Sequence, residues 1–568
     1  MAPPSRVGKG IGGIGVLGGL DGFLVLAAIA CLFIAGSINA DQTMPTNDPG
    51  RTAPAEAPKQ QLSRELLVTA NYLQLPVVNR KDGHQDLEEL RIEADGKLLR
   101  YLHVEFPTQG EKPDYWYSWD LREFKGRIVT LRYKSRDPEA LNQLALGDKE
   151  ISGPNAYATG YRPQFHFSPR VGWMNDINGS YYQNGLYHIF FQYNPASTTR
   201  GAGFDMHWGH AVSKDLVHWE EWPVALFPNA AGQCYSGTTL MQKQAVPGLN
   251  AGVKLPAPVI FFAATTPFSQ HIATSPDGGY SWTRFAGNPV VPNMGDDDRD
   301  PKVFWHAPSE HYIMVLYVGG PDTYRILRSK DLIHWEQTCV LPSWYECPEF
   351  FPVKSAINGQ DLMLLYGSYH TPKGAANPIN FSSCYQLGHF DGKVFAPVTN
   401  IRQAHLGPSF YAALVFTNAP KSRHIMMGWA AGTQFPGENF NQCASIPLEL
   451  SLRVINGEDT LCFEPVKELD WLRGHPLLKL SHVTVAEANA KLQGLAKDSA
   501  LDIVLRLRPS PSGTVAVTVR NAAFTYDPVT KLLSLGDRSK TLHPGATLDA
   551  RFLIDHGIVE SFWNSGEA

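Results

Sequence analysis

The chain has 568 residues, which predicts three or four domains. Apolar residues make up 43% and charged residues 18%, as in ordinary globular proteins. The net charge of −5 argues against nucleic acid as a partner. The seven cysteines form neither a CxxC pair nor a Cys/His cluster with metal-ligand spacing. We therefore expect no zinc site, and we expect most cysteines to be buried free thiols.

The first 40 residues have the pattern of an export signal. Two basic residues precede an apolar run at 23–34, and small residues then lead to a cleavage point after Ala40. An uncleaved membrane anchor is the second interpretation of residues 1–40, and lipoprotein processing at Cys31 is the third. All three predict an exported protein, which is secreted, periplasmic or held at the outer surface.

Residues 41–61 are rich in Pro, Thr, Ala and Gln and are predicted to be a disordered linker. From 62 to 156, short runs such as RIVTLRYK alternate with period two between turn residues, which predicts a small N-terminal β-sandwich. Residues 470–568 alternate in the same way and predict a C-terminal β-sandwich. The abrupt end after WNSGEA leaves open whether this sandwich is short or truncated.

Between these regions, about residues 160–455, a motif recurs. SKDLVHW ends at Trp219, SPDGGYSW at Trp282 and SKDLIHW at Trp335, and a weaker copy, FDGKVF, ends at Phe395. A period of about 60 residues indicates repeated supersecondary units. Each unit contains about four strand-like runs, as a propeller blade does. The region therefore predicts a five-bladed β-propeller within an all-β protein.

Three acidic motifs lie in three different predicted blades. They are WMNDING with Asp176, RDPKVFW with Asp300, and ECPEFFP with Glu346. The inner strands of a propeller converge, so these acids can meet in one concave site. Cleavage of a glycosidic bond requires two carboxyl groups, one ionised and one protonated. A third carboxylate can bind sugar hydroxyls.

The ordered set of motifs resembles a known family. HFSPRVGWMNDING, MHWGHAVSKDLVHW, CYSGTT, RDPKVFW, ECPEFFP, SFYAALVF and MGWA are similar to glycoside hydrolase family 32, which comprises invertases, inulinases, levanases and fructosyltransferases. The resemblance covers about 160–568 and implies a five-bladed propeller followed by a β-sandwich. Segment 62–156 resembles the accessory β-domain of some levanase-like members.

The resemblance implies a role for each acid. Asp176 is expected to be the nucleophile, Glu346 the acid/base, and Asp300 the stabiliser of the transition state. Arg299 is expected to orient Asp300. The residues implied to line a fructose pocket are Trp173, Met174, Asn175, Gln192, Trp208, Tyr235, Ser236, Arg299 and Trp429.

Some positions are open to other interpretations. Core packing is the alternative for Trp208 and Trp429, and we expect His166 and His207 to brace the fold. His405 and Ser409 depart from the Asp that many members carry, which leaves the specificity for the leaving group open.

The leading prediction is a retaining β-fructosidase acting on levan, inulin or sucrose, with no metal and no organic cofactor. A fructosyltransferase using the same covalent intermediate is the alternative, followed by a non-catalytic carbohydrate-binding propeller. The expected partner is a fructose-containing oligo- or polysaccharide. A membrane is expected only through the N-terminal anchor, and the oligomeric state is not predicted.

Overall fold

The computed structural model describes residues 58–80, 86–152, 156–199, 205–246, 248–249, 252–370, 380–492 and 500–568, together with strand β1 (Ile11–Gly19). Apart from β1, the predicted leader lies outside these residues, as does nearly all of the predicted linker. Within the described part the chain is all-β, as predicted, and its one α-helix is α1 (Val485–Leu492). No helix in that part is long and apolar enough to cross a membrane.

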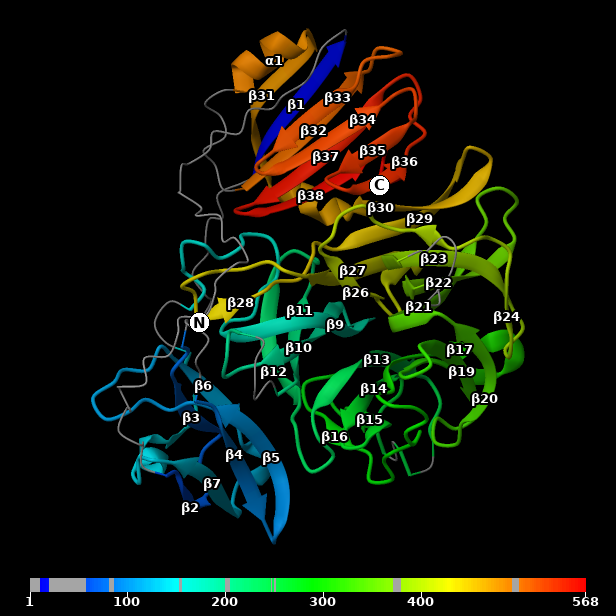
Figure 1. Cartoon of the computed structure of the whole chain (residues 1–568). Helices are drawn as coiled ribbons and strands as arrows, with labels where there is room; N and C mark the ends of the chain where they lie inside the picture. Colours follow the sequence, from blue (N-terminus) through cyan, green and yellow to red (C-terminus); the bar gives the residue numbers. More distant parts are fainter. Residues whose placement is uncertain are drawn as a thin grey trace, which may run out of the picture.

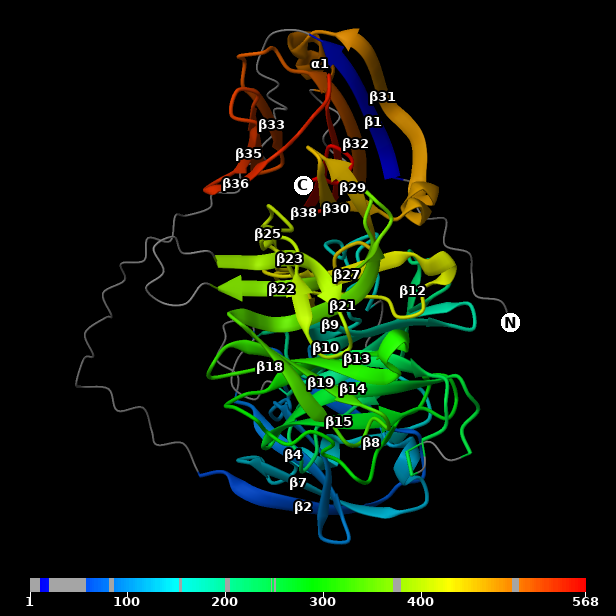
Figure 2. The ribbon, with the colours of Figure 1, turned by 90° about the vertical axis from the view of Figure 1, so that its right-hand side faces the viewer.

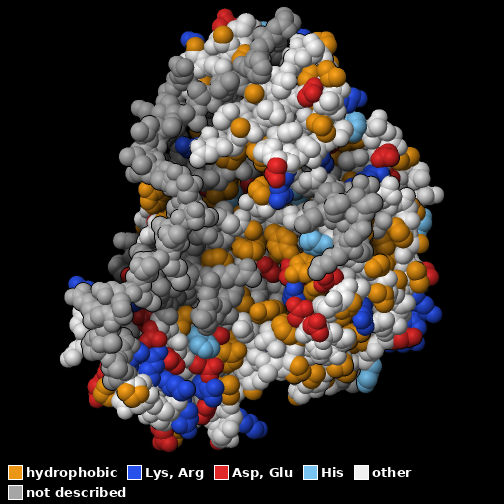
Figure 3. Space-filling model, in the orientation of Figure 1, with side chains coloured by type: hydrophobic (Ala, Val, Ile, Leu, Met, Phe, Trp, Pro, Cys, Tyr) orange, Lys and Arg blue, Asp and Glu red, His pale blue; other side chains and the backbone are white. Residues whose placement is uncertain are grey.

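The N-terminal unit contains two antiparallel sheets (Figure 1, blue to cyan). The first has the order β2-β7-β4-β5 and the second the order β6-β3-β8. The strands are β2 (Gln60–Leu67), β3 (Tyr72–Val77), β4 (Glu88–Ala94), β5 (Lys97–Val104), β6 (Tyr115–Asp120), β7 (Ile128–Ser135) and β8 (Ala145–Gly147). Buried residues alternate with more exposed ones along β5, β6 and β7, as the period-two pattern predicts. Charged side chains of both signs gather over this unit (Figure 3).

The middle of the chain forms five sheets. Their strands are β9 (Gly172–Gln183), β10 (Leu186–Asn194), β11 (His207–Ser213), β12 (Trp219–Leu226) and β28 (Phe440–Asn441); β13 (Cys234–Gln242), β14 (Ala257–Thr265), β15 (Phe268–Thr274) and β16 (Thr283–Arg284); β17 (Arg299–His306), β18 (His311–Val318), β19 (Thr323–Ser329) and β20 (Glu336–Pro342); β21 (Trp344–Lys354), β22 (Asp361–His370), β23 (Asn380–Phe390), β24 (Phe395–Pro397) and β25 (Arg402–Gln403); and β26 (Phe410–Val415), β27 (His424–Ala430), β29 (Leu448–Ile455) and β30 (Glu458–Pro465).

These sheets are arranged in a ring, as in a β-propeller (Figures 1 and 2). The innermost strands are β9, β13, β17, β21 and β26. Each contacts the next one along the chain, and β26 contacts β9, which closes the ring. The last sheet extends to Pro465, ten residues beyond the predicted end of this region.

The repeated sequence motif is a turn that joins the third and fourth strands of a sheet. In SKDLVHW, Asp215 Oδ1 accepts the backbone N–H groups of Val217 and His218 and the hydroxyl of Ser213. Asp331 makes the same bonds in SKDLIHW, and Asp277 holds the related turn before β16. Local hydrogen bonds of this kind explain why the motif could be recognised in the sequence.

The C-terminal unit has two sheets, with the orders β31-β1-β32-β37-β38 and β33-β34-β35-β36. Their strands are β31 (Arg473–Val483), β32 (Ala500–Arg508), β33 (Val515–Val519), β34 (Ala522–Asp527), β35 (Leu532–Leu535), β36 (Arg538–Thr541), β37 (Leu548–Asp555) and β38 (Ile558–Trp563). Side chains from both sheets, among them Leu505, Val517, Phe524 and Trp563, share one buried apolar cluster. Strand β1 lies between β31 and β32 and is parallel to both.

One buried carboxylate joins this unit to the ring. Asp555 on β37 accepts the backbone N–H groups of Gln164, Phe165 and His166 and contacts the His166 ring at 2.9 Å. Burial alone would lower the pKa of His166, but its hydrogen bonds to Asp555 and Glu560 outweigh this effect and raise the pKa to about 9. His166 therefore braces the fold, as the sequence analysis expects.

Candidate active site

Each inner strand carries a β-bulge at one end. On β9, Asn175 and Asp176 lie opposite the single residue Gln192 of β10. The register also shifts between Cys234 and Gly237 on β13, between Arg299 and Lys302 on β17, between Tyr345 and Glu349 on β21, and between Tyr411 and Leu414 on β26. A bulge redirects side chains out of the alternating pattern. All three predicted catalytic acids lie within these bulges.

Three of the bulges hold non-glycine residues in the left-handed backbone region. The φ angles are 61° at Asp300 on β17, 42° at Glu346 and 47° at Cys347 on β21, and 47° at Ala412 on β26. Such conformations cost about 1–3 kcal/mol each and concentrate at functional sites. The surrounding ladders must supply this free energy, because the bulged residues themselves lack regular ladder bonds.

Asp176 is held by two side-chain donors. Ser236 Oγ donates to Oδ2 at 2.7 Å, and Asn175 Nδ2 donates to Oδ1 at 3.0 Å. Trp173 Nε1 in turn donates to Asn175 Oδ1 at 3.1 Å and fixes the orientation of that amide. Burial raises the pKa of Asp176, these two hydrogen bonds lower it, and the charge of Glu346 raises it further.

Asp300 lies beside Cys347. The backbone N–H of Cys347 donates to Asp300 Oδ2 at 2.9 Å, and its Sγ lies 3.5 Å from the same oxygen and 4.0 Å from Asp176 Oδ2. Cys347 therefore contacts both carboxylates. Burial raises the pKa of Asp300, the Arg299 guanidinium opposes this, and the charges of Glu346 and Asp176 add to the rise.

Both oxygens of Glu346 have partners. Arg299 donates to Oε1 from Nη2 at 2.6 Å and from Nε at 3.2 Å, and the Tyr411 hydroxyl donates to Oε2. The other hydrogen bonds of Arg299 go to Asp297 and to the hydroxyl of Tyr345. Toward Asp300, the charge of Arg299 lowers the pKa of the carboxyl and so favours its ionised form. The bulges at positions 300 and 346 determine which carboxylate faces the guanidinium.

The remaining predicted binding residues lie around this cluster but differ in exposure. Tyr235 shares the bulge of Ser236 on β13, and Trp429 on β27 is half-buried with Nε1 bonded to Gln442 Oε1 at 3.0 Å. Gln192 is buried and donates to the carbonyl of Cys234 at 2.9 Å.

Two of the expected pocket residues have no exposed surface. Trp208 is 0% exposed, packs against Phe190 and Phe262, and donates from Nε1 to the carbonyl of Tyr235. Met174 is also 0% exposed. Their neighbours in the sheets cover both side chains, so their expected role in a fructose pocket stays a prediction. His207 is likewise buried, and burial lowers its pKa to about 4.

Three contributors were not assigned a role from the sequence. Cys347 and Tyr411 belong to the ECPEFFP and SFYAALVF motifs, which carry the family resemblance. The residue types alone do not indicate the contacts that these two side chains make. Tyr324 donates to the backbone carbonyls of Tyr345 and Glu346 and holds the bulge of β21 in place. No local pattern marks Tyr324, since its partner lies in a different sheet.

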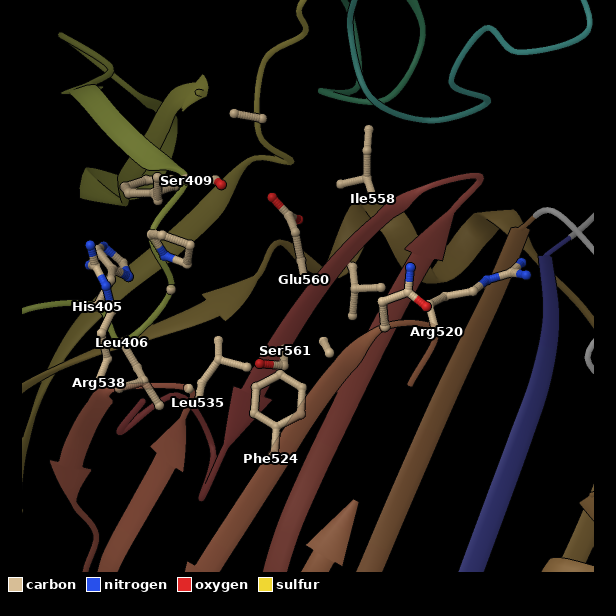
Figure 4. Close-up of a pocket in the computed structure, with 18 of the residues that line it drawn as sticks. His405, Leu406, Ser409, Arg520, Phe524, Leu535, Arg538, Ile558, Glu560 and Ser561 are labelled. Atoms are coloured by element: carbon tan, nitrogen blue, oxygen red, sulfur yellow. The ribbon is translucent and has the colours of Figure 1, made fainter. Parts of the chain in front are cut away.

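A separate cavity of about 1780 Å³ lies between the ring and the C-terminal unit. His405 and Ser409 line its wall, together with Arg520, Phe524 and Glu560 (Figure 4). Burial lowers the pKa of His405 to about 3. The structure thus places these two departures from the family pattern on this cavity.

Comparison with known proteins gives consistent matches. A sequence model described as the glycosyl hydrolases family 32 N-terminal domain matches residues 166–465. A levanase of Bacillus subtilis (strain 168) is 32% identical over 458 residues, which are 72% of this chain and 66% of the levanase. An extracellular exo-inulinase of Aspergillus niger is 30% identical over 482 residues, which are 72% of this chain and 89% of the inulinase.

Solved structures share the fold. An exo-inulinase from Aspergillus awamori superposes with a TM-score of 0.57 at 23% identity, covering 72% of this chain and 92% of that chain. A fructofuranosidase from Schwanniomyces occidentalis complexed with fructose has a TM-score of 0.57 at 22% identity, covering 72% of this chain and 91% of that chain.

Proposed function

Because this chain belongs to glycosyl hydrolase family 32, a family of glycosidases, we propose that it is a retaining β-fructosidase that releases fructose from levan, inulin or sucrose. We further propose that the five central sheets are the blades of one propeller (160–465) and that the two C-terminal sheets form a β-sandwich. The predicted residues 62–156 are proposed to be the N-terminal accessory domain. The named activities of the levanase and the exo-inulinase support the choice of substrate class.

In the first step, Asp176 attacks the anomeric carbon of the fructosyl unit. The bond from that carbon to the leaving oxygen breaks, and Glu346 gives its proton to that oxygen. Ser236 and Asn175 each donate one hydrogen bond to Asp176, which favours the ionised form that a nucleophile requires. Asp300 stabilises the positive charge that develops on the sugar.

In the second step, Glu346 takes a proton from water, and the oxygen of that water attacks the anomeric carbon of the fructosyl ester. The ester bond to Asp176 breaks, free fructose leaves, and Glu346 is protonated again. The first step requires that the acid cluster retain a proton near neutral pH, and the second requires that Glu346 be ionised. Burial and the neighbouring carboxylates raise the pKa of Asp300 to about 7, which supports the retention of one proton within the cluster.

The observation that carries the proposal is the convergence of the three acids. Cys347 contacts Asp176 and Asp300, and its neighbour Glu346 is held by Arg299 and Tyr411. A retaining mechanism predicts that the carboxyl groups of Asp176 and Glu346 lie about 5 to 5.5 Å apart. A separation near 9 Å in a crystal structure would indicate inversion and contradict the proposal.

The test is product chromatography with sucrose, inulin and levan. We expect fructose release by the wild-type chain and a loss of at least about 10³-fold in Asp176→Ala. Glu346→Gln should form the fructosyl ester with a substrate whose leaving group is already activated, and mass spectrometry should detect it on the peptide that contains Asp176. Undiminished activity in Asp176→Ala would show that the nucleophile is assigned wrongly.

Fructosyl transfer is the second candidate, because a sugar hydroxyl can replace water in the second step. New oligosaccharides from concentrated sucrose would favour it, whereas equimolar release of glucose and fructose would favour hydrolysis. Export, as a signal peptide or an N-terminal anchor would provide, is proposed because the exo-inulinase relatives are named extracellular.

A further inference from the structure

The N-terminal unit contacts the segment that joins β10 to β11. Tyr115 Oη donates to the carbonyl of Pro195 at 2.9 Å. Thr198 donates to Asn79 Oδ1 from its backbone N–H at 3.2 Å and from Oγ1 at 2.9 Å. Further along, Asp205 accepts the backbone N–H of His103 and contacts its ring. The N-terminal unit therefore holds the segment near both of its ends.

On its other side, the same segment is bonded to the strand that carries the nucleophile. Asn441 Nδ2 donates to the carbonyl of Thr198 at 3.0 Å. Asn441 belongs to β28, which pairs in parallel with the start of β9, so that Asn441 lies opposite Trp173. Strand β28 is the edge strand of the sheet that contains β9 (Figure 1).

The start of β9 also packs directly against this segment. Gly172 has φ +80°, and a Cβ there would lie 2.3 Å from the carbonyl oxygen of Asn194 and 2.9 Å from Pro195 Cα. Only glycine permits both this conformation and this approach. A shift of residues 195–198 would therefore displace the backbone of Gly172 and its neighbours.

From Trp173 the contacts continue to the reacting atoms. Its indole N–H donates to Asn175 Oδ1, and Asn175 Nδ2 donates to Asp176 Oδ1. Asn79 is 2% exposed, Thr198 7% and Asn441 9%. Hydrogen bonds between buried groups have restricted geometry, because an unpaired buried polar group costs about 1–3 kcal/mol.

We propose that the N-terminal unit is a positioning element of the active site, which sets the place of the Asp176 carboxyl through Asn79, Thr198, Asn441 and Trp173. This rests on the proposed function, since it assigns Asp176 the role of nucleophile. The unit thereby acts as a fixed part of the catalytic machinery, in contrast to a tethered sugar-binding module.

The interface offers a matched control. Arg122 donates to Tyr280 Oη at 3.1 Å and lies over its ring. This contact also joins the N-terminal unit to the ring of sheets, but it leads to the turn before β16, which meets β9 at Tyr181 and not at Asp176. Asn79→Ala and Arg122→Ala thus remove one interface contact each, and only the first lies on the path to Asp176.

The experiment measures kcat and KM of the full chain on sucrose and on levan. We expect Asn79→Ala and Thr198→Val to lower kcat about tenfold with KM changed less than about twofold, since misplacement of a reacting group acts on the chemical step. Thr198→Ser, which keeps the hydroxyl, should restore kcat. Arg122→Ala should leave kcat within about twofold of wild type.

Hydrogen exchange supplies a readout that does not depend on activity. Amides of residues 172–176 should exchange faster in Asn79→Ala and Thr198→Val than in wild type. In Arg122→Ala their exchange rates should equal those of wild type. An active wild type with unchanged kcat and unchanged exchange in both variants would overturn the inference. A wild type without activity on any fructoside would instead contradict the proposed function, while the exchange result would still decide the positioning role.

Discussion

The hydroxyl of Ser236 makes the shortest hydrogen bond to Asp176, and this bond affects the pKa of that carboxyl. Its hydrogen bond stabilises the charged form and therefore lowers a pKa that burial raises. Ser236→Ala should move the acid limb of the kcat/KM profile to higher pH and lower kcat. A pH–rate series from pH 3 to 8 measures this. Ser329→Ala, which removes a buried serine hydroxyl from the SKDLIHW turn, is the control and should leave the limb in place.

The hydroxyl of Tyr411 donates to Glu346 and so acts on the proposed proton donor. In Tyr411→Phe, Glu346 keeps Arg299 as its only hydrogen-bond partner among the contacts described above. We expect kcat on sucrose to fall about tenfold. The loss should be smaller on a fructoside with an activated leaving group, which needs little protonation. Equal losses on both substrates would argue against a role in proton donation.

At this scale the sequence reveals the acids better than their partners. Asp176, Asp300 and Glu346 stand in short local motifs, and the structure brings them together. That Arg299 bonds Glu346 instead of Asp300 depends on the left-handed backbone at both positions, which the residue types do not encode. The burial of Trp208 depends on Phe262, a residue of the next sheet, and no pattern within β11 predicts it.

At the scale of elements, an ion pair holds two of the catalytic strands together. Lys302 on β17 bonds Glu349 on β21 at 2.8 Å, and both side chains are buried. Glu349 also accepts the backbone N–H of Val415 on β26. The Glu349 carboxylate thus connects three inner strands. Lys302 lies two residues after Asp300, and Glu349 lies three residues after Glu346.

Glu349→Gln should destabilise the chain by about 3–5 kcal/mol, because it leaves the buried Lys302 charge without a counter-charge. Lys302→Met combined with Glu349→Leu should lose less, since neither charge remains. Denaturant unfolding of both variants tests this order. A double variant less stable than Glu349→Gln would contradict it.

The recurring turns were predictable and the bulges were not. SKDLVHW and SKDLIHW specify their turns through bonds within six residues, so the sequence alone indicates the repeat. Each inner strand meets two conditions. It pairs with the neighbouring strand of its own sheet, and its bulged residues face the other inner strands at the centre of the ring. The second condition involves residues more than 40 positions away, such as Asp300 and Cys347. Very short edge strands such as β16 also lack a recognisable alternation.

At the scale of the whole molecule, Asp555 and His166 fasten the C-terminal unit to the ring. The folded-state pKa of His166 is about 9, above its usual 6.5. The stability from this pair is therefore fully present below pH 6.5 and is lost as the pH rises toward 9.

Between pH 6.5 and 8, this group should lower the free energy of unfolding by up to about 1.4 kcal/mol per pH unit. Asp555→Asn should destabilise the chain and flatten this slope, as thermal unfolding at several pH values would show. Burial lowers the pKa of Lys540 to about 8. Above pH 8 this group therefore raises the free energy of unfolding with pH and opposes the effect of His166. An unchanged slope in Asp555→Asn would exclude the pair as its source.

The order of the three units could be predicted because each has its own alternation or repeat. Their junctions could not be predicted, since Asn79 with Thr198 and His166 with Asp555 are separated by 119 and 389 residues. Strand β1 illustrates the same limit: its sequence is an apolar, glycine-rich run that gives no indication of its partners β31 and β32.

The closed ring of inner strands has a consequence for how such a site can change. Each sheet supplies one bulge to the centre of the ring. The outer strands of that sheet keep their hydrogen-bond ladder whichever side chain the bulge carries. A substitution at one bulge therefore leaves the backbone of the other four bulges intact. If the proposed function holds, new specificities can arise by exchange at a single bulge while the other four bulges keep their form.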